Sequence, residues 1–302
     1  MNTRMRVTAI PTLMAASLLG KFGAFSAVAA QTESFEDLGL EKISLVMTPD
    51  TITGMPIELA AGNYLVELSG EPMEGETDLS VMLFRFPDGM TLDTMPALDP
   101  SSPMLPDFIY EGTFAGGRDV ILDTGETSSQ CVVTLTAGDW MLADGQLVRP
   151  LQAFTVTGEV PADAPTPTST VDMMMGEMYF HITGGELVAG RNVLSLTAMG
   201  GQPHFVVMLG LPPGMTDDQF EMMFAAAEGP EEESSPTAED GGGDEGGGIA
   251  AVLVTSIQSL GTTSWMNVEL ASGTYGLACF FPDQHVGMPH AMLGMHTVVE
   301  VP

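Results

Sequence analysis

The strongest constraint on the fold is an internal repeat. Four segments in the first half of the chain return in the same order in the second half, at offsets of 125 to 144 residues. The changing offset indicates that loops differ in length while the regular elements persist. The paired segments are 58–68 with 186–196, 81–91 with 206–216, 132–140 with 267–275, and 152–157 with 296–301.

Each repeated segment has the pattern of a β-strand. Apolar and polar residues alternate, β-branched and aromatic residues are frequent, and Ala-Gly or Ser-Gly pairs mark the turns. The run 205–209 is apolar throughout, which is typical of a strand buried between two sheets. The sequence therefore predicts an all-β protein built of two tandem Greek-key β-sandwich domains.

One short helix is expected in each repeat, just after the segments that end at Thr91 and Thr216. In the second repeat, Thr216 can cap the helix and Gln219 can complete a capping box. The residues that follow, 220–227, are mostly apolar and can pack against a sheet.

The N-terminus has the pattern of a secretory signal. Arg4 and Arg6 precede an apolar stretch at 7–20, and small residues lead to a cleavage site after Ala30. Lys21 interrupts the apolar run, which argues against a stable membrane-spanning helix. We expect a secreted or periplasmic protein that lacks residues 1–30 and has no membrane span after cleavage.

Two later segments have linker-like composition. Residues 158–172 are rich in Pro and Thr and are expected to connect the repeats, and residues 228–248 are acidic, rich in Gly and without apolar anchors. The sequence thus predicts a first β-sandwich repeat at 31–157 and a second at 173–302, with 228–248 as a loop inside the second.

The charge balance restricts the partners. After loss of the signal, five basic residues face 40 acidic ones, a formal net charge of −35. Such a surface repels nucleic acid and suits a basic partner, so a basic redox partner protein is expected. Only Lys42 remains among the lysines, which disfavours lysine-dependent covalent catalysis.

Histidine and cysteine are unevenly placed. All five histidines lie in the second repeat, at 181, 204, 285, 290 and 296, so the two repeats differ in chemistry. The two cysteines beyond the signal, Cys131 and Cys279, lie in different repeats. They could form a disulfide in an exported protein, or Cys279 could serve as a metal ligand.

The end of the second repeat resembles the cupredoxins, the blue-copper (type 1) domain family. A Cys at the end of a strand, Cys279, is followed by a His and a Met five positions apart, His290 and Met295. Upstream, His204 follows a Pro and precedes an apolar strand, as the other histidine of that family does. The likeness covers about residues 178–302. In the first repeat, Leu79 aligns with His204 and Asp144 with Cys279, so it is predicted to be a relative without the ligands.

The resemblance implies one copper ion held by His204, Cys279, His290 and Met295. A thiolate and two imidazoles suit copper in a trigonal arrangement, with a thioether as a weak axial ligand. The sequence departs from the family in the ten residues between Cys279 and His290, where cupredoxins have fewer. His285 and Met288 lie within or beside that stretch and form an alternative ligand pair.

Two classes of function follow from these patterns. The first is an exported copper protein for electron transfer or copper handling, and the second is an exported structural or interaction module without metal. The sequence has no Gly-x-Ser-x-Gly, no phosphate-binding Gly-rich loop and no His-Glu-x-x-His. We therefore expect no enzymatic activity. Convergence of His204, Cys279 and His290 to within about 4 Å would favour the copper protein.

Overall fold

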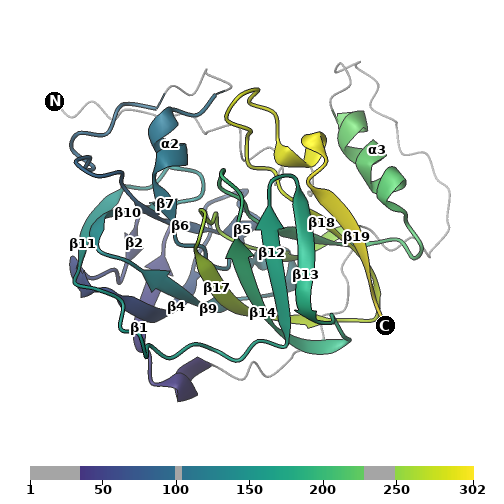
Figure 1. Ribbon diagram of the computed structural model, residues 1–302, viewed down its shortest axis with the longest axis horizontal. Coiled ribbons are helices and arrows are strands. Elements are labelled where there is room, and N and C mark those ends of the chain that lie inside the picture. The colour runs from purple at the N-terminus through teal and green to yellow at the C-terminus, as the bar shows by residue number, and fades with distance from the viewer. Residues whose placement is uncertain (1–34, 99–103, 228–248) are drawn as a thin grey trace.

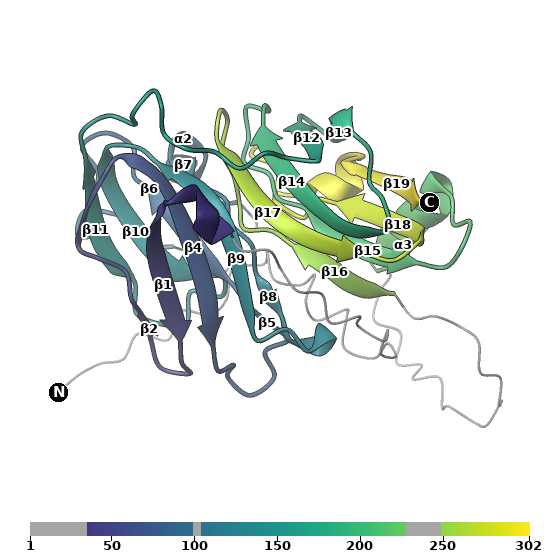
Figure 2. The ribbon, with the colours of Figure 1, turned by 90° about the horizontal axis from the view of Figure 1, so that it is seen from below.

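The computed structural model describes residues 35–98, 104–227 and 249–302. The predicted signal and the acidic loop 228–248 lie outside these residues. The described chain is a β-sandwich, as predicted, with the first repeat on one side and the second on the other (Figures 1 and 2). Within the described residues, no helix has the length and apolar character needed to cross a membrane.

Among the described residues, the first repeat contributes eleven strands and three short helical segments. In chain order these are η2 Phe35–Leu38, β1 Glu41–Met47, β2 Ile52–Thr53, β3 Glu58–Ala60, β4 Gly62–Gly70, β5 Asp78–Leu79, β6 Val81–Arg85, α2 Asp107–Glu111, β7 Thr113–Phe114, β8 Val120–Ile121, η3 Leu122–Thr124, β9 Ser128–Leu135, β10 Gly138–Asp144 and β11 Gln152–Thr157.

The second repeat contributes eight strands and two helical segments among the described residues. They are β12 Val171–Gly176, β13 Tyr179–Gly185, β14 Gly190–Ala198, β15 Val207–Leu211, α3 Asp217–Ala227, β16 Ala250–Val254, β17 Thr263–Leu270, β18 Gly273–Ala278, η4 His290–Leu293 and β19 His296–Val301.

One large sheet runs through both repeats. Its strand order, β13-β12-β14-β17-β9-β4-β1-β2, places matching strands of the two repeats at matching distances from the centre. At the centre β9 and β17 pair antiparallel, with Val132 opposite Trp265 and Cys131 opposite Met266. Each repeat therefore closes an exposed edge of the other, because paired edge strands no longer present free N–H and C=O groups.

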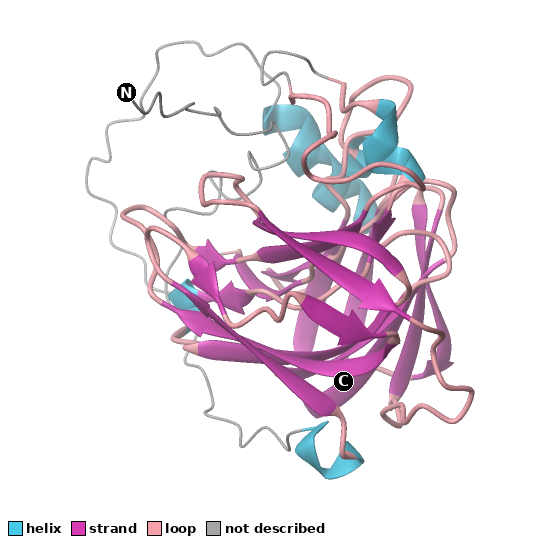
Figure 3. Cartoon of the chain, turned by 90° about the vertical axis from the view of Figure 1, so that its left-hand side faces the viewer, coloured by secondary structure: helices cyan, strands magenta, loops and turns pink. Residues whose placement is uncertain are grey.

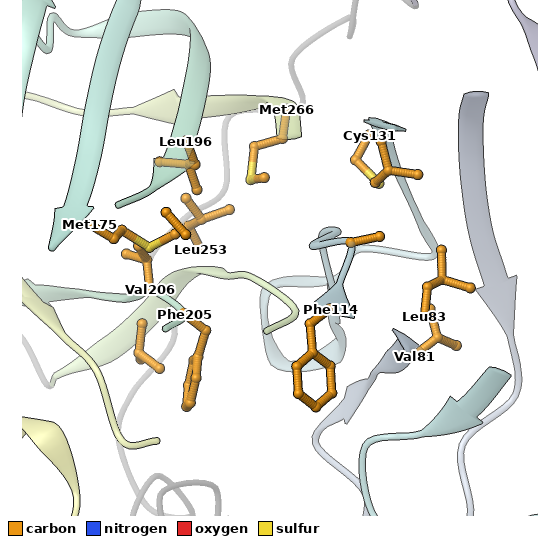
Figure 4. Close-up of a cluster of buried hydrophobic side chains, with 14 of the residues drawn as sticks. Val81, Leu83, Phe114, Cys131, Met175, Leu196, Phe205, Val206, Leu253 and Met266 are labelled. Carbon is orange, nitrogen blue, oxygen red and sulfur yellow. The ribbon is translucent and has the colours of Figure 1, made fainter. Parts of the chain in front are cut away.

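Two smaller sheets cover the large one and complete the sandwich (Figure 3). The first repeat supplies β3-β11-β10-β6-β7 and the second supplies β16-β15-β18-β19. The strands carry the alternation that the sequence predicts; β1, for example, buries Ile43, Leu45 and Met47 and exposes the residues between them. The main hydrophobic core spans both repeats, and Figure 4 shows labelled side chains from each of them within it. Phe35, Leu65 and Val132 form a second, smaller cluster.

The predicted helix of the second repeat is confirmed together with its cap. The Thr216 Oγ1 accepts a hydrogen bond from the Gln219 N–H at 3.3 Å, and the Gln219 Oε1 accepts one from the Thr216 N–H at 3.0 Å. In the first repeat the predicted position is wrong. Thr91 forms a local turn with Thr94, and Pro96 prevents a helix there, so the short helix α2 comes later, at Asp107–Glu111.

The first repeat has a buried ion cluster where the second has Cys279. Asp144, which aligns with Cys279, accepts hydrogen bonds from the N–H groups of Gln146, Val148 and Arg149. The Arg149 guanidinium binds both carboxylate oxygens of Glu76, each at 2.8 Å, and lies 3.6 Å from Asp144. All three charged side chains are at least 95% buried, so each charge depends on its partners to offset the cost of removing it from water.

Replacing Arg149 tests this cluster. In Arg149→Met, Glu76 and Asp144 lose their buried cationic partner, and Asp144 keeps only its hydrogen bonds from backbone N–H groups, so we expect a loss of about 3–5 kcal/mol in the free energy of unfolding. The control is Lys42→Met, which removes partly exposed ion pairs with Glu36 and Glu67 and should cost about 1 kcal/mol or less. Urea unfolding measures both; equal losses in the two variants would contradict the assignment.

Candidate metal centre

Three side chains from separate segments of the second repeat meet at one end of its smaller sheet. His204 lies just before β15, Cys279 directly follows β18, and His290 begins η4. The Nδ1 atoms of His204 and His290 are 3.1 Å apart, and the Cys279 Sγ lies 3.6 Å from His290 Nδ1 and 4.0 Å from His204 Nδ1. This triad is fully buried and has the composition and spacing of a metal site.

The fourth predicted residue, Met295, is also fully buried. Its carbonyl accepts a hydrogen bond from the Cys279 N–H at 3.1 Å, and its own N–H donates to the His290 carbonyl at 2.9 Å. The backbone of Met295 is thereby fixed to both Cys279 and His290. This arrangement continues the pairing of β18 with β19, whose last rung joins Ala278 and His296.

Burial sets the protonation of the triad. Desolvation lowers the pKa of His204 to about 4, and desolvation followed by the neighbouring His204 lowers the pKa of His290 to about 4. Desolvation raises the pKa of the Cys279 thiol to about 12. Without a metal, the site therefore holds two neutral imidazoles and a protonated thiol at neutral pH, because burial disfavours each charged form.

The ten residues between Cys279 and His290, 280–289, form a loop that is closed at its base; we call this loop the excursion. The His290 N–H donates to the Phe281 carbonyl at 2.9 Å, so Pro282 and Pro289 face each other at the base of the loop. Above this base, the Asp283 carboxylate accepts hydrogen bonds from the N–H groups of His285 and Val286. The extra residues thus leave the site and return to it. The longer chain does not move His290 away from Cys279, because the loop is closed at its base.

The excursion separates the two alternative residues from the triad. His285 is exposed, and Met288 has 36% of its surface exposed. Among the other histidines, His181 is exposed on β13, whereas His296 directs its Nδ1 to the Ala291 carbonyl at 3.0 Å. The alternative Cys131–Cys279 disulfide does not form, because both cysteines are free and buried in different parts of the core.

Side chains that the sequence did not single out hold the segments of the site together. The Gln202 side-chain amide donates to Asp283 at 2.8 Å and accepts from the Gln284 N–H at 2.6 Å, which ties the His204 segment to the excursion. The Gln202 N–H donates to Glu177, in the turn between β12 and β13, at 2.8 Å. Gln202 and Asp283 stand within the motifs that resemble cupredoxins, but only their contacts show this role.

Two neighbouring glycines lie above His204. A Cβ added to Gly200 would lie 2.3 Å from the His204 Nε2 and 2.8 Å from the Glu177 Oε1, whereas a Cβ on Gly201 would come no closer than 3.4 Å to Glu177. The His204 ring is buried, its Nε2 has no hydrogen-bond partner among the described residues, and Gly200 lies against this edge of the ring. Gly200 is therefore required for the present position of His204.

Comparison with known proteins gives distant structural likenesses. No family model and no curated protein matches the chain. Among solved structures, auracyanin B is 21% identical over 45% of this chain and 91% of its own, with a TM-score of 0.27. The auracyanin of Roseiflexus castenholzii is 17% identical over 45% and 99%, also with a TM-score of 0.27. Auracyanins are cupredoxins, the class that the sequence predicted.

Longer matches include enzymes, which corrects one expectation. A multicopper oxidase from Pseudomonas thermotolerans is 10% identical over 87% of this chain and 68% of its own, with a TM-score of 0.22. A copper nitrite reductase from Nitrosomonas europaea is 8% identical over 86% and 93%, also with a TM-score of 0.22. The sequence-based expectation of no enzymatic activity is therefore wrong as an exclusion, because cupredoxin-like domains also occur in enzymes.

The two glycines provide a matched test of the site. In Gly200→Ala the new methyl group displaces the His204 ring, so we expect metal affinity to fall at least tenfold, since each ligand must stay close to its bonding position. Gly201→Ala adds the same methyl group with ordinary room and should retain the affinity of the unaltered protein. Titration with copper against a competing chelator measures both; equal affinities would show that Gly200 does not position His204.

Proposed function

We propose that the protein binds one copper ion, which His204, Cys279 and His290 would hold with Met295 as a weaker fourth ligand, and that it serves in electron transfer or copper handling. The observation that carries the proposal is the convergence of two imidazole Nδ1 atoms and one thiol within 4.0 Å of one another in a fully buried place. Neighbouring strands and the closed excursion hold all three groups.

The spacing of the three donor atoms fits a trigonal metal site. Nitrogen and sulfur ligands about 2.0–2.3 Å from a metal, arranged trigonally, lie about 3.5–3.7 Å from one another. The separations of 3.1, 3.6 and 4.0 Å bracket that range. Two imidazoles and a thiolate favour copper over zinc, because structural zinc prefers four strong tetrahedral ligands.

The protonation of the triad supports metal uptake at neutral pH. Both imidazoles are already neutral, because burial lowers the pKa of each to about 4. Cys279 must lose its proton on binding, since burial raises the pKa of the thiol to about 12 and only the thiolate is a strong ligand. Uptake of the metal should therefore release one proton per site near pH 7.

Electron transfer is the chemistry that a bound copper ion would supply here. The protein contributes a donor set acceptable to both oxidation states and a rigid, water-excluding surround. Hydrogen bonds from Cys279, Ala291 and Met295 fix the backbone of the site, so the donors need not move between the two states. A donor set that keeps its geometry lowers the cost of each electron transfer.

The cellular setting is part of the same proposal. The predicted signal at 1–30 favours a secreted or periplasmic protein, and the net charge favours a basic redox partner. Association with such a partner should weaken as salt rises, because the attraction between exposed charges is screened.

Cysteine replacement tests the proposal. The copper-loaded, oxidised protein should contain about one copper per chain and show a strong visible band from the thiolate–copper bond. Cys279→Ala should lose both. Cys131→Ala removes the other buried thiol, which lies at the β9–β17 pairing, and should keep both signals. A colourless, copper-free unaltered protein would overturn the proposal in favour of a module without metal.

Histidine replacement separates the two ligand pairs. His290→Ala should abolish the visible band, because it removes one of the three converging donors. His285→Ala should leave the band and the copper content unchanged, because His285 is exposed on the excursion and points to solvent. The reverse result, loss of the band only in His285→Ala, would assign the ligand role to His285 and Met288. Visible absorption and metal analysis of the two variants distinguish these cases.

A further inference from the structure

The first repeat contacts the segment that carries Cys279 and His290. Helix α2 of the first repeat lies beside the excursion (Figure 1). The Tyr110 hydroxyl donates a hydrogen bond to the Pro282 carbonyl at 3.0 Å, and the Tyr110 ring meets the Phe281 ring edge to face at 5.7 Å. Phe281 in turn lies 5.9 Å from the His290 ring. Tyr110 is therefore separated from a proposed ligand by a single side chain.

The first repeat also contacts the segment that pairs with His204. The backbone of His204 exchanges two hydrogen bonds with Gln258, at 2.9 and 2.7 Å. Gln258 also pairs with Ala115, four residues beyond the end of α2. The flanking residues extend this pairing, because the Gly116 N–H donates to the Ile257 carbonyl at 3.0 Å. One stretch of the first repeat, 110–116, thus contacts the Cys279–His290 segment directly and is joined to His204 through Gln258.

The hydrogen bond from Tyr110 is made to the base of the excursion, where the loop closes. Pro282 forms the base of the excursion with Pro289, and neither proline has an N–H to donate. The base is held by two backbone hydrogen bonds, from His290 to Phe281 and from Asp283 to Met288. Among the described residues, Tyr110 is the hydrogen-bond partner of the Pro282 carbonyl, which lies between those two bonds.

The position of α2 is fixed by close packing against β6. A Cβ on Gly112, just after the helix, would lie 2.1 Å from the Phe84 ring and 2.9 Å from the Arg85 carbonyl, so the chain lies directly on β6. Burial, followed by the charges of Asp283 and Asp107, raises the pKa of Tyr110 to about 12. The phenol therefore keeps its proton, and with it the hydrogen bond, at physiological pH.

We propose that the ligand-free first repeat forms the outer wall of the metal centre, and that Tyr110 is a positioning residue that holds the Cys279–His290 loop closed. The inference rests on the proposed function for its relevance to copper, but the restraint on the loop exists without metal. The inference gives the first repeat, which has no predicted metal ligands of its own, a role in the metal centre.

The test uses the full chain with Tyr110→Phe, which removes only the hydroxyl group. The matched control is Tyr64→Phe, which removes a similar bond, from the Tyr64 hydroxyl to the Ala60 carbonyl, elsewhere in the first repeat. In the metal-free protein, the amide hydrogens of Asp283 and His290 should exchange about three- to tenfold faster in Tyr110→Phe than in the unaltered chain, the range expected for one hydrogen bond. They should be unchanged in Tyr64→Phe.

A second measurement addresses the copper site directly. Transfer of copper from the loaded protein to a chelator should accelerate by a similar factor in Tyr110→Phe. Unchanged exchange at Asp283 and His290, or an equal rise throughout the chain, would overturn the positioning role. Faster exchange confined to this loop in a protein that binds no copper would sustain the role of Tyr110 and refute the proposed function instead.

Discussion

The antiparallel pairing of β9 with β17 is the contact on which the rest of the structure depends. Backbone hydrogen bonds between two central strands merge the repeats into one sheet, and the smaller sheets then cover a continuous core. The pairing also fixes how the repeats face each other. It places α2 of the first repeat against the loop after β18, a contact that neither repeat could make alone.

The repeats solve one structural problem in two ways. The strand that ends at Asp144 and the strand that leads to Cys279 are each followed by a loop that must leave the core and return. In the first repeat Asp144 and Arg149 close that loop with charge, through hydrogen bonds to backbone and to Glu76. In the second repeat the same place is kept free of charge at neutral pH, and a thiol and two imidazoles converge there. A bound cation would give it the cross-link that Arg149 supplies in the first.

The strands could be predicted because their signal is local. Alternation within six to nine residues and a repeated order are visible in the sequence, and so is the Thr216–Gln219 cap. The convergence of His204, Cys279 and His290 could be predicted because the end of the second repeat and the segment around His204 both resemble cupredoxins. The excursion after Cys279 could not be predicted, because its closure depends on hydrogen bonds such as that from His290 to Phe281. The contact from Tyr110 to Pro282 joins residues 172 positions apart in the sequence, and no local sequence pattern predicts it.

Complete burial of the triad has a consequence for how the site is filled. An ion in solution has no direct approach to His204, Cys279 or His290, since none of them has exposed surface. Entry therefore requires the loop between Cys279 and His290 to open, or the ion to be present before that loop closes during folding. For the proposed copper site, the rate of metallation would then depend on the opening or folding of this loop more than on the concentration of free metal.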